Sequence, residues 1–156
     1  MIQVYTGPGK GKTTAAFGLA MRAAGHDLGV RVIQFMKGRY ASGEVIAAYR
    51  LGIEVFRYGK EKEDFTAGWQ LAGETLREDR HQLLIMDEFI YGFKYGYLEE
   101  AEILSWLDAL PEELEVVFTG RDAPGALRER AHLVSVITPE KHYYQEGIAS
   151  RIGIEY

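Results

Sequence analysis

The clearest chemical pattern in the chain is the segment Thr-Gly-Pro-Gly-Lys-Gly-Lys-Thr-Thr at residues 6–14. It follows a short apolar run and precedes a helical pattern, which is where phosphate-binding loops stand. Its end, Gly11-Lys12-Thr13, matches the Walker A pattern G-x-x-x-x-G-K-[ST], although Thr6 occupies the first glycine position. The segment predicts a loop that binds phosphate groups. The alternative is a glycine-rich turn with surface lysines.

The residue types in this loop suit a nucleotide. Glycines let backbone N–H groups approach phosphate oxygens without a side-chain clash, and the start of the following helix adds further donors. Lys12 supplies a positive charge and Lys10 a second one. The hydroxyl of Thr13 is an oxygen ligand of the kind that Mg²⁺ prefers.

Two carboxylates follow the most hydrophobic strand candidate. Asp87-Glu88 comes after Leu-Leu-Ile-Met, which resembles a Walker B strand. Either carboxylate could bind a Mg²⁺ ion held by Thr13, and we expect the two strands concerned to be neighbours. The alternative is a polar cap on a buried strand.

Two arginines complete the candidate site. Arg121, in Thr119-Gly120-Arg121, ends a later strand and could neutralise phosphate charge, or could be solvated or salt-bridged instead. Arg22 lies in the first predicted helix and could reach the nucleotide or pair with a carboxylate. The histidines have no metal-ligand spacing.

These residues must be positioned by alternating strands and helices. Apolar runs predict strands at residues 2–5, 30–35, 53–56, 82–86, 115–119 and 133–137. Helical patterns are found at residues 12–24, 44–50, 65–79, 97–109 and 124–131. This alternation predicts an α/β fold with a mostly parallel central sheet, covered by helices on both faces. Ligands bind beyond the carboxyl ends of such strands, where the candidate residues fall.

Composition narrows the functional classes. The chain has 156 residues, the length of one domain, and its 47% hydrophobic and 26% charged residues exclude intrinsic disorder. Its net charge of −5 disfavours nucleic acid as a partner, and the lack of cysteine excludes disulfides and thiol nucleophiles. No apolar stretch is long enough to span a membrane and no signal-peptide pattern is present, so we expect a cytoplasmic protein.

Several segments together resemble one family. Residues 6–18 resemble the start of the ATP:corrinoid adenosyltransferases of the cobalamin-pathway type. Further matching segments occur in family order: Arg22-Ala23, residues 32–38, Asp87-Glu88 with Tyr91, Thr119-Gly120-Arg121, Lys141-His142 and residues 153–156. The resemblance covers nearly the whole chain, and this set of segments is far more specific than the loop alone.

The resemblance implies a fold, a reaction and partners. The fold would be a RecA-like P-loop domain over residues 1–156, in a homodimer. The reaction would transfer the 5′-deoxyadenosyl group of ATP to the Co(I) centre of a reduced corrinoid and release triphosphate. A flavodoxin-type protein would supply the electron that reduces Co(II).

The resemblance also implies roles for individual residues. Mg²⁺ would be bound by Thr13 and Glu88, and Lys12 and Arg121 would stabilise the leaving triphosphate. The family's aromatic loop after the third strand is replaced here by the charged residues 59–64, so Phe65 is the nearest aromatic candidate for the corrin ring, with residues 36–44 contributing. The implied ATP-binding residues are Gly7, Gly9, Lys10, Gly11, Lys12, Thr13 and Thr14, and Arg22 is retained beside them as a further candidate.

Two other functions fit the same residues. One is a P-loop ATPase or small-molecule kinase, in which Glu88 would be the base that activates water or a hydroxyl group. The other is a non-catalytic module that binds a nucleotide or a corrinoid. Adenosyl transfer needs no catalytic base because Co(I) is itself the nucleophile, so the reaction products distinguish these functions.

Overall fold

The computed structural model of the chain describes residues 1–38 and 42–155. Its centre is a six-stranded parallel sheet in the order β3-β2-β4-β5-β1-β6. The strands are β1 (Ile2–Thr6), β2 (Val30–Gln34), β3 (Glu54–Arg57), β4 (Leu83–Asp87), β5 (Glu115–Thr119) and β6 (Leu133–Val136). The helices are α1 (Lys12–Ala24), α2 (Gly43–Arg50), α3 (Lys62–Thr75), α4 (Tyr91–Tyr95), α5 (Glu100–Asp108) and α6 (Gly125–Arg130).

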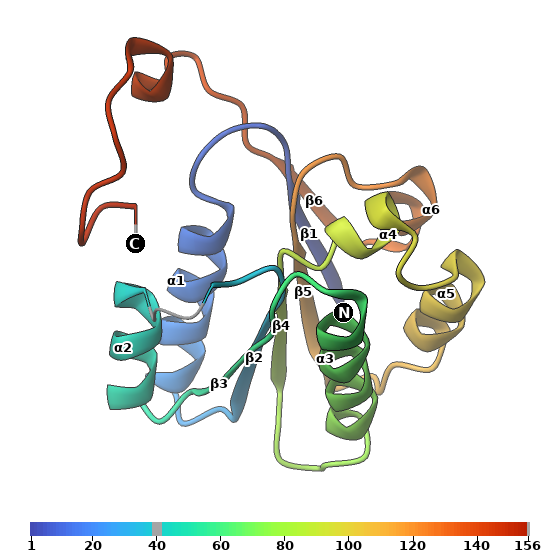
Figure 1. The fold of residues 1–156 in the computed structure, drawn as a ribbon. Helices are drawn as coiled ribbons and strands as arrows, with labels where there is room; N and C mark the ends of the chain where they lie inside the picture. Colours follow the sequence, from blue (N-terminus) through green and yellow to red (C-terminus); the bar gives the residue numbers. More distant parts are fainter. Residues whose placement is uncertain (39–41, 156) are drawn as a thin grey trace.

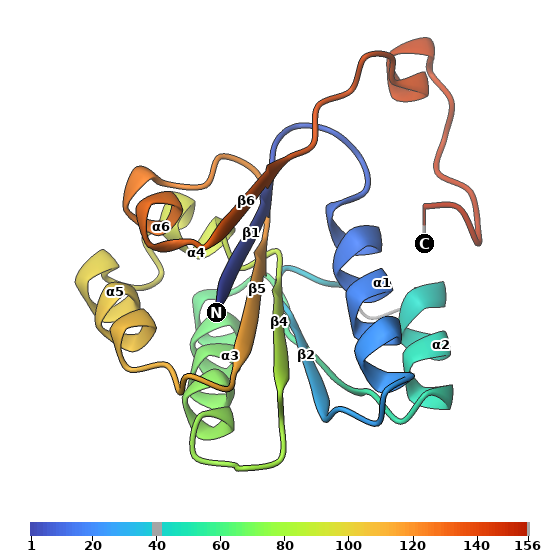
Figure 2. The ribbon, with the colours of Figure 1, turned by 180° about the vertical axis from the view of Figure 1, so that it is seen from behind.

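Helices cover both faces of the sheet. Helices α1 and α2 lie on one face and α3, α4, α5 and α6 on the other (Figure 1; Figure 2 shows the same layers from behind). All five residues of β2 and all five of β4 are buried, as expected for central parallel strands between two helical layers. The predicted α/β architecture is confirmed, and it is consistent with a RecA-like P-loop type.

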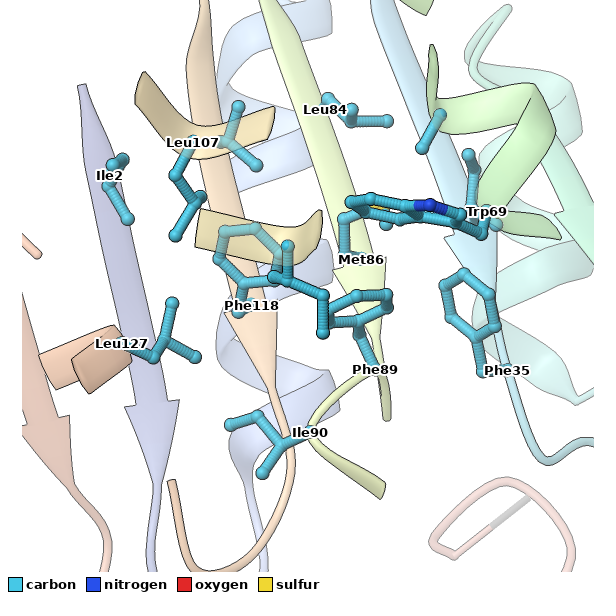
Figure 3. Close-up of a cluster of buried hydrophobic side chains, with 14 of the residues drawn as sticks. Ile2, Phe35, Trp69, Leu84, Met86, Phe89, Ile90, Leu107, Phe118 and Leu127 are labelled. Carbon is cyan, nitrogen blue, oxygen red and sulfur yellow. The ribbon is translucent and has the colours of Figure 1, made fainter. Parts of the chain in front are cut away.

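The two faces carry different cores. Small residues of α1, such as Ala16 and Ala20, pack on aliphatic side chains of the sheet. The opposite core is rich in aromatic rings, and Figure 3 shows Trp69, Phe89 and Phe118 together beside β4 and β5. The ring centroids of Trp69 and Phe89 are 5.4 Å apart, and those of Phe89 and Phe118 are 5.3 Å apart. This aromatic core supports the strand ends that carry the acidic residues.

One expectation about the elements is wrong, and another needs new bounds. Strand β5 lies between β1 and β4, so the strands preceding Thr13 and Glu88 are not neighbours. The helix expected over residues 97–109 is present as α5 but is shorter, and the short α4 before it was not predicted.

The chain after β6 runs back across the molecule. It contains a 3₁₀ helix, η1 (Tyr143–Glu146), and then returns towards the start of α1 (Figure 1). Within the described residues, no helix combines the length and apolar character needed to cross a membrane.

Candidate nucleotide-binding site

A cavity of about 570 Å³ lies at the carboxyl edge of the sheet, where the loops after β1, β2, β4 and β5 meet. Most of the predicted site residues line it. The lining residues are Gly9, Lys10, Gly11, Lys12, Thr13, Thr14, Phe17, Lys37, Gly43, Glu44, Glu88, Tyr91, Arg121, His142, Gly153, Ile154 and Glu155. The cavity therefore brings together the phosphate loop, the acidic strand end and the arginine that the sequence singled out.

The loop after β1 needs its glycines. Gly7 and Gly11 have φ angles of 104° and 119°, which side chains rarely adopt. A Cβ atom on Gly7 would lie 2.5 Å from the carbonyl oxygen of Ile137, and Gly9 N–H donates to that oxygen at 2.8 Å. Thr6, at the position of the missing first glycine, accepts a hydrogen bond from Ala123 N–H at 3.2 Å. Ile137, directly after β6, thus packs against the phosphate loop and holds it in place.

Lys12 points into the centre of this loop. Its ammonium group donates to the carbonyl oxygens of Gly7 and Gly9 at 2.9 and 2.7 Å. The residue is only 7% exposed, and burial lowers its pKa. The amine now binds two neutral carbonyl oxygens. A phosphate oxygen carries negative charge and would form a stronger hydrogen bond with it, so the amine is well placed to bind an anion.

Asp87 holds the strand ends together. Its Oδ1 accepts hydrogen bonds from Thr13 Oγ1 at 2.8 Å and Thr119 Oγ1 at 2.7 Å. Its Oδ2 accepts one from Gln34 at 2.9 Å and forms an ion pair with Lys37 at 3.0 Å. The carboxylate is fully buried and surrounded by donors, so it fixes the positions of the loops after β1, β2 and β5.

Glu88 differs from Asp87 in its backbone conformation and in its hydrogen bonding. Its φ angle is +62°, an uncommon conformation outside glycine, and its backbone N–H donates to Thr119 Oγ1 at 2.8 Å. Its Oε2 is buried and has no hydrogen-bond partner within the described residues. Burial, and next the charge of Asp87, raise the pKa of Glu88. Glu88 lines the cavity, and its buried Oε2 is the oxygen left without a partner among the described residues.

The donor set fits Mg²⁺. Thr13 Oγ1, Asp87 Oδ1 and the unpaired Glu88 Oε2 are hard oxygen ligands. Residues 1–38 and 42–155 contain no group of three His, Cys, Asp or Glu that could hold a metal alone. Mg²⁺ normally takes one or two protein ligands and completes its shell with phosphate oxygens and water, so this small set is sufficient beside a triphosphate.

Three further basic residues and one tyrosine line the cavity. Arg121 and Lys37 line the cavity, and their charges lower the pKa of Glu88, although burial and Asp87 outweigh this effect. Tyr91 follows on α4, and burial, with the charge of Glu88, raises its pKa. Lys10 lies at the rim, where its amine contacts the C-terminal segment.

Three predicted site residues do not line this cavity. Gly7 lies in the loop itself, where its carbonyl oxygen accepts a hydrogen bond from the Lys12 amine. Arg22 lies in the last turn of α1, at the end of the helix remote from the phosphate loop, and it is exposed. Phe65 is fully buried in the aromatic core, with ring centroids 4.5 Å from Phe35 and 5.4 Å from Phe89. The expectation that a corrin ring stacks on Phe65 is therefore corrected, because its ring has no exposed face. Of residues 36–44, Lys37, Gly43 and Glu44 line the cavity, while 39–41 lie outside the described residues.

Sequence reasoning missed part of the site. It placed Lys37 only within the 36–44 segment expected near the corrin ring, and it assigned no role to Phe17 or the C-terminal residues Gly153, Ile154 and Glu155. Lys37 and the C-terminal residues lie in segments that resemble the family, and this resemblance could have pointed to them as site residues. It expected Thr13 and Glu88 to share Mg²⁺ but did not foresee that the Thr13 hydroxyl donates a hydrogen bond to Asp87.

Known proteins match the chain over its full length. The family model described as "ATP:corrinoid adenosyltransferase BtuR/CobO/CobP" matches residues 1–156. The corrinoid adenosyltransferase of Escherichia coli K12 is 36% identical over 167 residues, covering 100% of this chain and 85% of that protein. The corrinoid adenosyltransferase CobA of Salmonella typhimurium LT2 gives the same figures, and the Pseudomonas aeruginosa protein is 34% identical with 83% of its length covered. This chain belongs to the ATP:corrinoid adenosyltransferase family.

Proposed function

We propose that the chain transfers the 5′-deoxyadenosyl group of ATP to the Co(I) centre of a reduced corrinoid. The observation that carries this proposal is the family match over residues 1–156. The cavity supports it, since a phosphate loop, a free carboxylate and an arginine surround a space large enough for a nucleotide.

The reaction is a displacement at carbon. The electron pair of Co(I) forms a bond with C5′ of the ribose, the C5′–O bond breaks, and its electrons leave with the triphosphate. No proton has to be removed from the nucleophile, so the protein's tasks are alignment and stabilisation of the departing charge. Lys12, the loop N–H groups and Arg121 are suited to the second task.

Thr13 and Glu88 would hold Mg²⁺ against the triphosphate. Bound there, Mg²⁺ would supply positive charge to the leaving group. Asp87 keeps Thr13 in position, and Lys37 balances the charge of Asp87. The proposal further includes a homodimer, a flavodoxin-type electron donor and a cytoplasmic location.

Product analysis tests the function. The protein is incubated with ATP, Mg²⁺ and chemically reduced cobalamin or cobyrinic acid diamide. We expect triphosphate and an adenosylated corrinoid in equal amounts. Formation of ADP or phosphate would instead indicate an ATPase or kinase, in which the raised pKa of Glu88 suits a general base. Tight ATP binding without turnover would indicate a binding module.

A further inference from the structure

The C-terminal segment is fastened to the phosphate loop through Lys10. The Lys10 amine donates to the hydroxyl of Tyr143 at 2.7 Å, to the carbonyl oxygen of Ile154 at 2.9 Å and to Glu155 Oε1 at 2.9 Å. Figure 1 shows this segment, in red, leaving β6 and returning beside the start of α1. Residues about 140 positions apart in the chain are thereby joined.

Glu155 is the centre of this contact. Besides the hydrogen bond from Lys10, its carboxylate accepts one from the Tyr143 hydroxyl. The backbone N–H of Arg151 donates to its Oε2 at 2.7 Å, and the guanidinium group of Arg151 donates to its Oε1 at 3.2 Å. Arg151, followed by Tyr143 and Lys10, holds the pKa of Glu155 far below its usual range. The carboxylate therefore stays charged and attractive to Lys10 at every pH at which the protein would be assayed.

The contacts leave Lys10 no spare donor. An ammonium group has three N–H donors, and Tyr143, Ile154 and Glu155 take all three. Lys12, in contrast, points into the loop centre. The two lysines of the loop thus have different tasks, and Lys12 is the one placed for the triphosphate.

The fastened segment forms one wall of the cavity. Gly153, Ile154 and Glu155 line it, together with Phe17 of α1. His142 of the same segment also lines the cavity. This wall therefore offers backbone, two apolar side chains, an imidazole and a carboxylate, and the carboxylate would repel phosphate. The groups suited to phosphate, Lys12 and Arg121, belong to other loops. A neutral, partly apolar nucleoside suits the wall better than a polyanion.

The geometry points to a clasp, formed by Lys10, Tyr143 and Glu155, that holds Gly153 and Ile154 against the nucleoside part of bound ATP. This inference rests on the proposed function, because it assumes that ATP occupies the cavity. Lys10 is then a positioning residue that acts through the C-terminal segment, and Ile154 is a contact of the base or ribose.

Affinities for ATP and for inorganic triphosphate, measured by calorimetry without corrinoid, test the clasp. We expect Lys10→Met and Glu155→Gln each to weaken ATP binding about tenfold, the scale of a lost charged hydrogen bond. The double variant should be no weaker than either single one, since both changes open the same contact. Affinity for triphosphate, which has no nucleoside, should stay within about twofold. Asp108→Asn is the matched control, because it breaks the exposed Arg130–Asp108 pair of 3.1 Å outside the cavity.

Three outcomes would overturn the inference. If Lys10→Met weakens triphosphate binding and adds to Glu155→Gln, Lys10 is a phosphate ligand. If ATP affinity is unchanged in both variants, the segment is not part of the site. If the unaltered chain does not bind ATP, the proposed function fails as well, and this is seen before any variant is made.

Limited proteolysis gives a readout independent of affinity. Trypsin cleaves after Arg151, which lies in the clasped segment. We expect ATP to slow this cleavage in the unaltered chain, while triphosphate leaves it unchanged. In folded Glu155→Gln, cleavage should be faster and the protection by ATP smaller. Equal cleavage rates in both proteins, with and without ATP, would contradict the clasp.

Discussion

Thr13 Oγ1 donates a hydrogen bond of 2.8 Å to Asp87 Oδ1, and this bond joins the first turn of α1 to the end of β4 across the intervening β5. Thr119, at the end of β5, donates to the same oxygen. Asp87 is thus occupied by donors, while the next residue, Glu88, has a buried oxygen with no partner among the described residues. The two adjacent carboxylates differ in their surroundings: Asp87 positions the loops, and Glu88 lines the cavity.

Glu88→Gln should impair the use of Mg²⁺. Glutamine keeps the shape of the side chain but loses the charge that attracts the ion. We expect turnover to fall by about tenfold or more and the Mg²⁺ concentration for half-maximal activity to rise. Titration of activity against Mg²⁺ at saturating ATP measures both. Unchanged activity and Mg²⁺ dependence would leave Glu88 as only the end of a strand.

Asp87→Asn should instead reduce stability. The amide NH2 group would replace one carboxylate oxygen and face either the hydroxyl donors of Thr13 and Thr119 or the donors of Gln34 and Lys37. In both orientations buried donors lose their acceptor. We expect a loss of about 1–3 kcal/mol in the free energy of unfolding, measured with urea. Glu88→Gln, which loses no hydrogen bond to a described residue, is the comparison at the neighbouring position and should not be destabilised. Equal stability of both variants would argue against the structural role of Asp87.

The raised pKa of Glu88 predicts how stability changes with pH. The folded protein holds this proton more tightly than the unfolded chain, so its stability falls as pH rises from the ordinary glutamate value, 4.5, through the raised folded pKa. Below the ordinary value both states are protonated and the effect disappears. Without Mg²⁺, Glu88→Gln should therefore match the unaltered chain near about pH 4 and exceed its stability near about pH 8.

Urea unfolding at the two pH values checks this. Glu63→Gln, on the exposed side of α3, is the control and should show no such difference. A stability gap between Glu88→Gln and the unaltered chain that does not depend on pH would contradict the assignment.

Local features of the fold could be predicted from the sequence. Helix α1 occupies residues 12–24 as expected, because its alanines form a stripe and the glycine-rich loop ends just before it. The insertion of β5 between β1 and β4 could not be predicted, since strand order depends on pairings between distant segments. The return of the C-terminal segment onto Lys10 is equally non-local.

The errors within the site also have physical causes. The positive φ of Glu88 gives neighbouring carboxylates separate environments, and no pattern of residue types reveals it. Phe65 was expected to contact the corrin ring because it is the nearest aromatic residue to the charged segment 59–64. Helix α3 starts earlier than predicted, at Lys62, and Phe65 is packed inward against Phe35 and Phe89.

Lys12→Ala should remove most of the ATP affinity and leave the fold intact. Within the described residues the Lys12 amine donates hydrogen bonds to the carbonyl oxygens of Gly7 and Gly9, and burial lowers its pKa, so its removal should cost the fold little. We expect a loss of about 10- to 100-fold in ATP affinity, the range for a hydrogen bond to a charged group. Calorimetry measures it, with exposed Lys62→Ala as the control. Wild-type affinity in Lys12→Ala would reject the phosphate-loop assignment.

Phe65→Ala should act through the core and not through the corrin ring. The ring fills space between Phe35, Phe89 and Gly92, so its removal should lower the free energy of unfolding by about 3–5 kcal/mol. Phe56→Ala, on the more exposed β3, should cost much less. Per folded molecule, adenosylation should change by the same factor whether Co(II) is reduced by a protein donor or Co(I) is supplied chemically. A corrin contact at Phe65 would promote the loss of a cobalt ligand before reduction, so it would affect the Co(II) assay more. A larger loss in that assay, at an equal folded fraction, would therefore restore Phe65 as a corrin-binding residue.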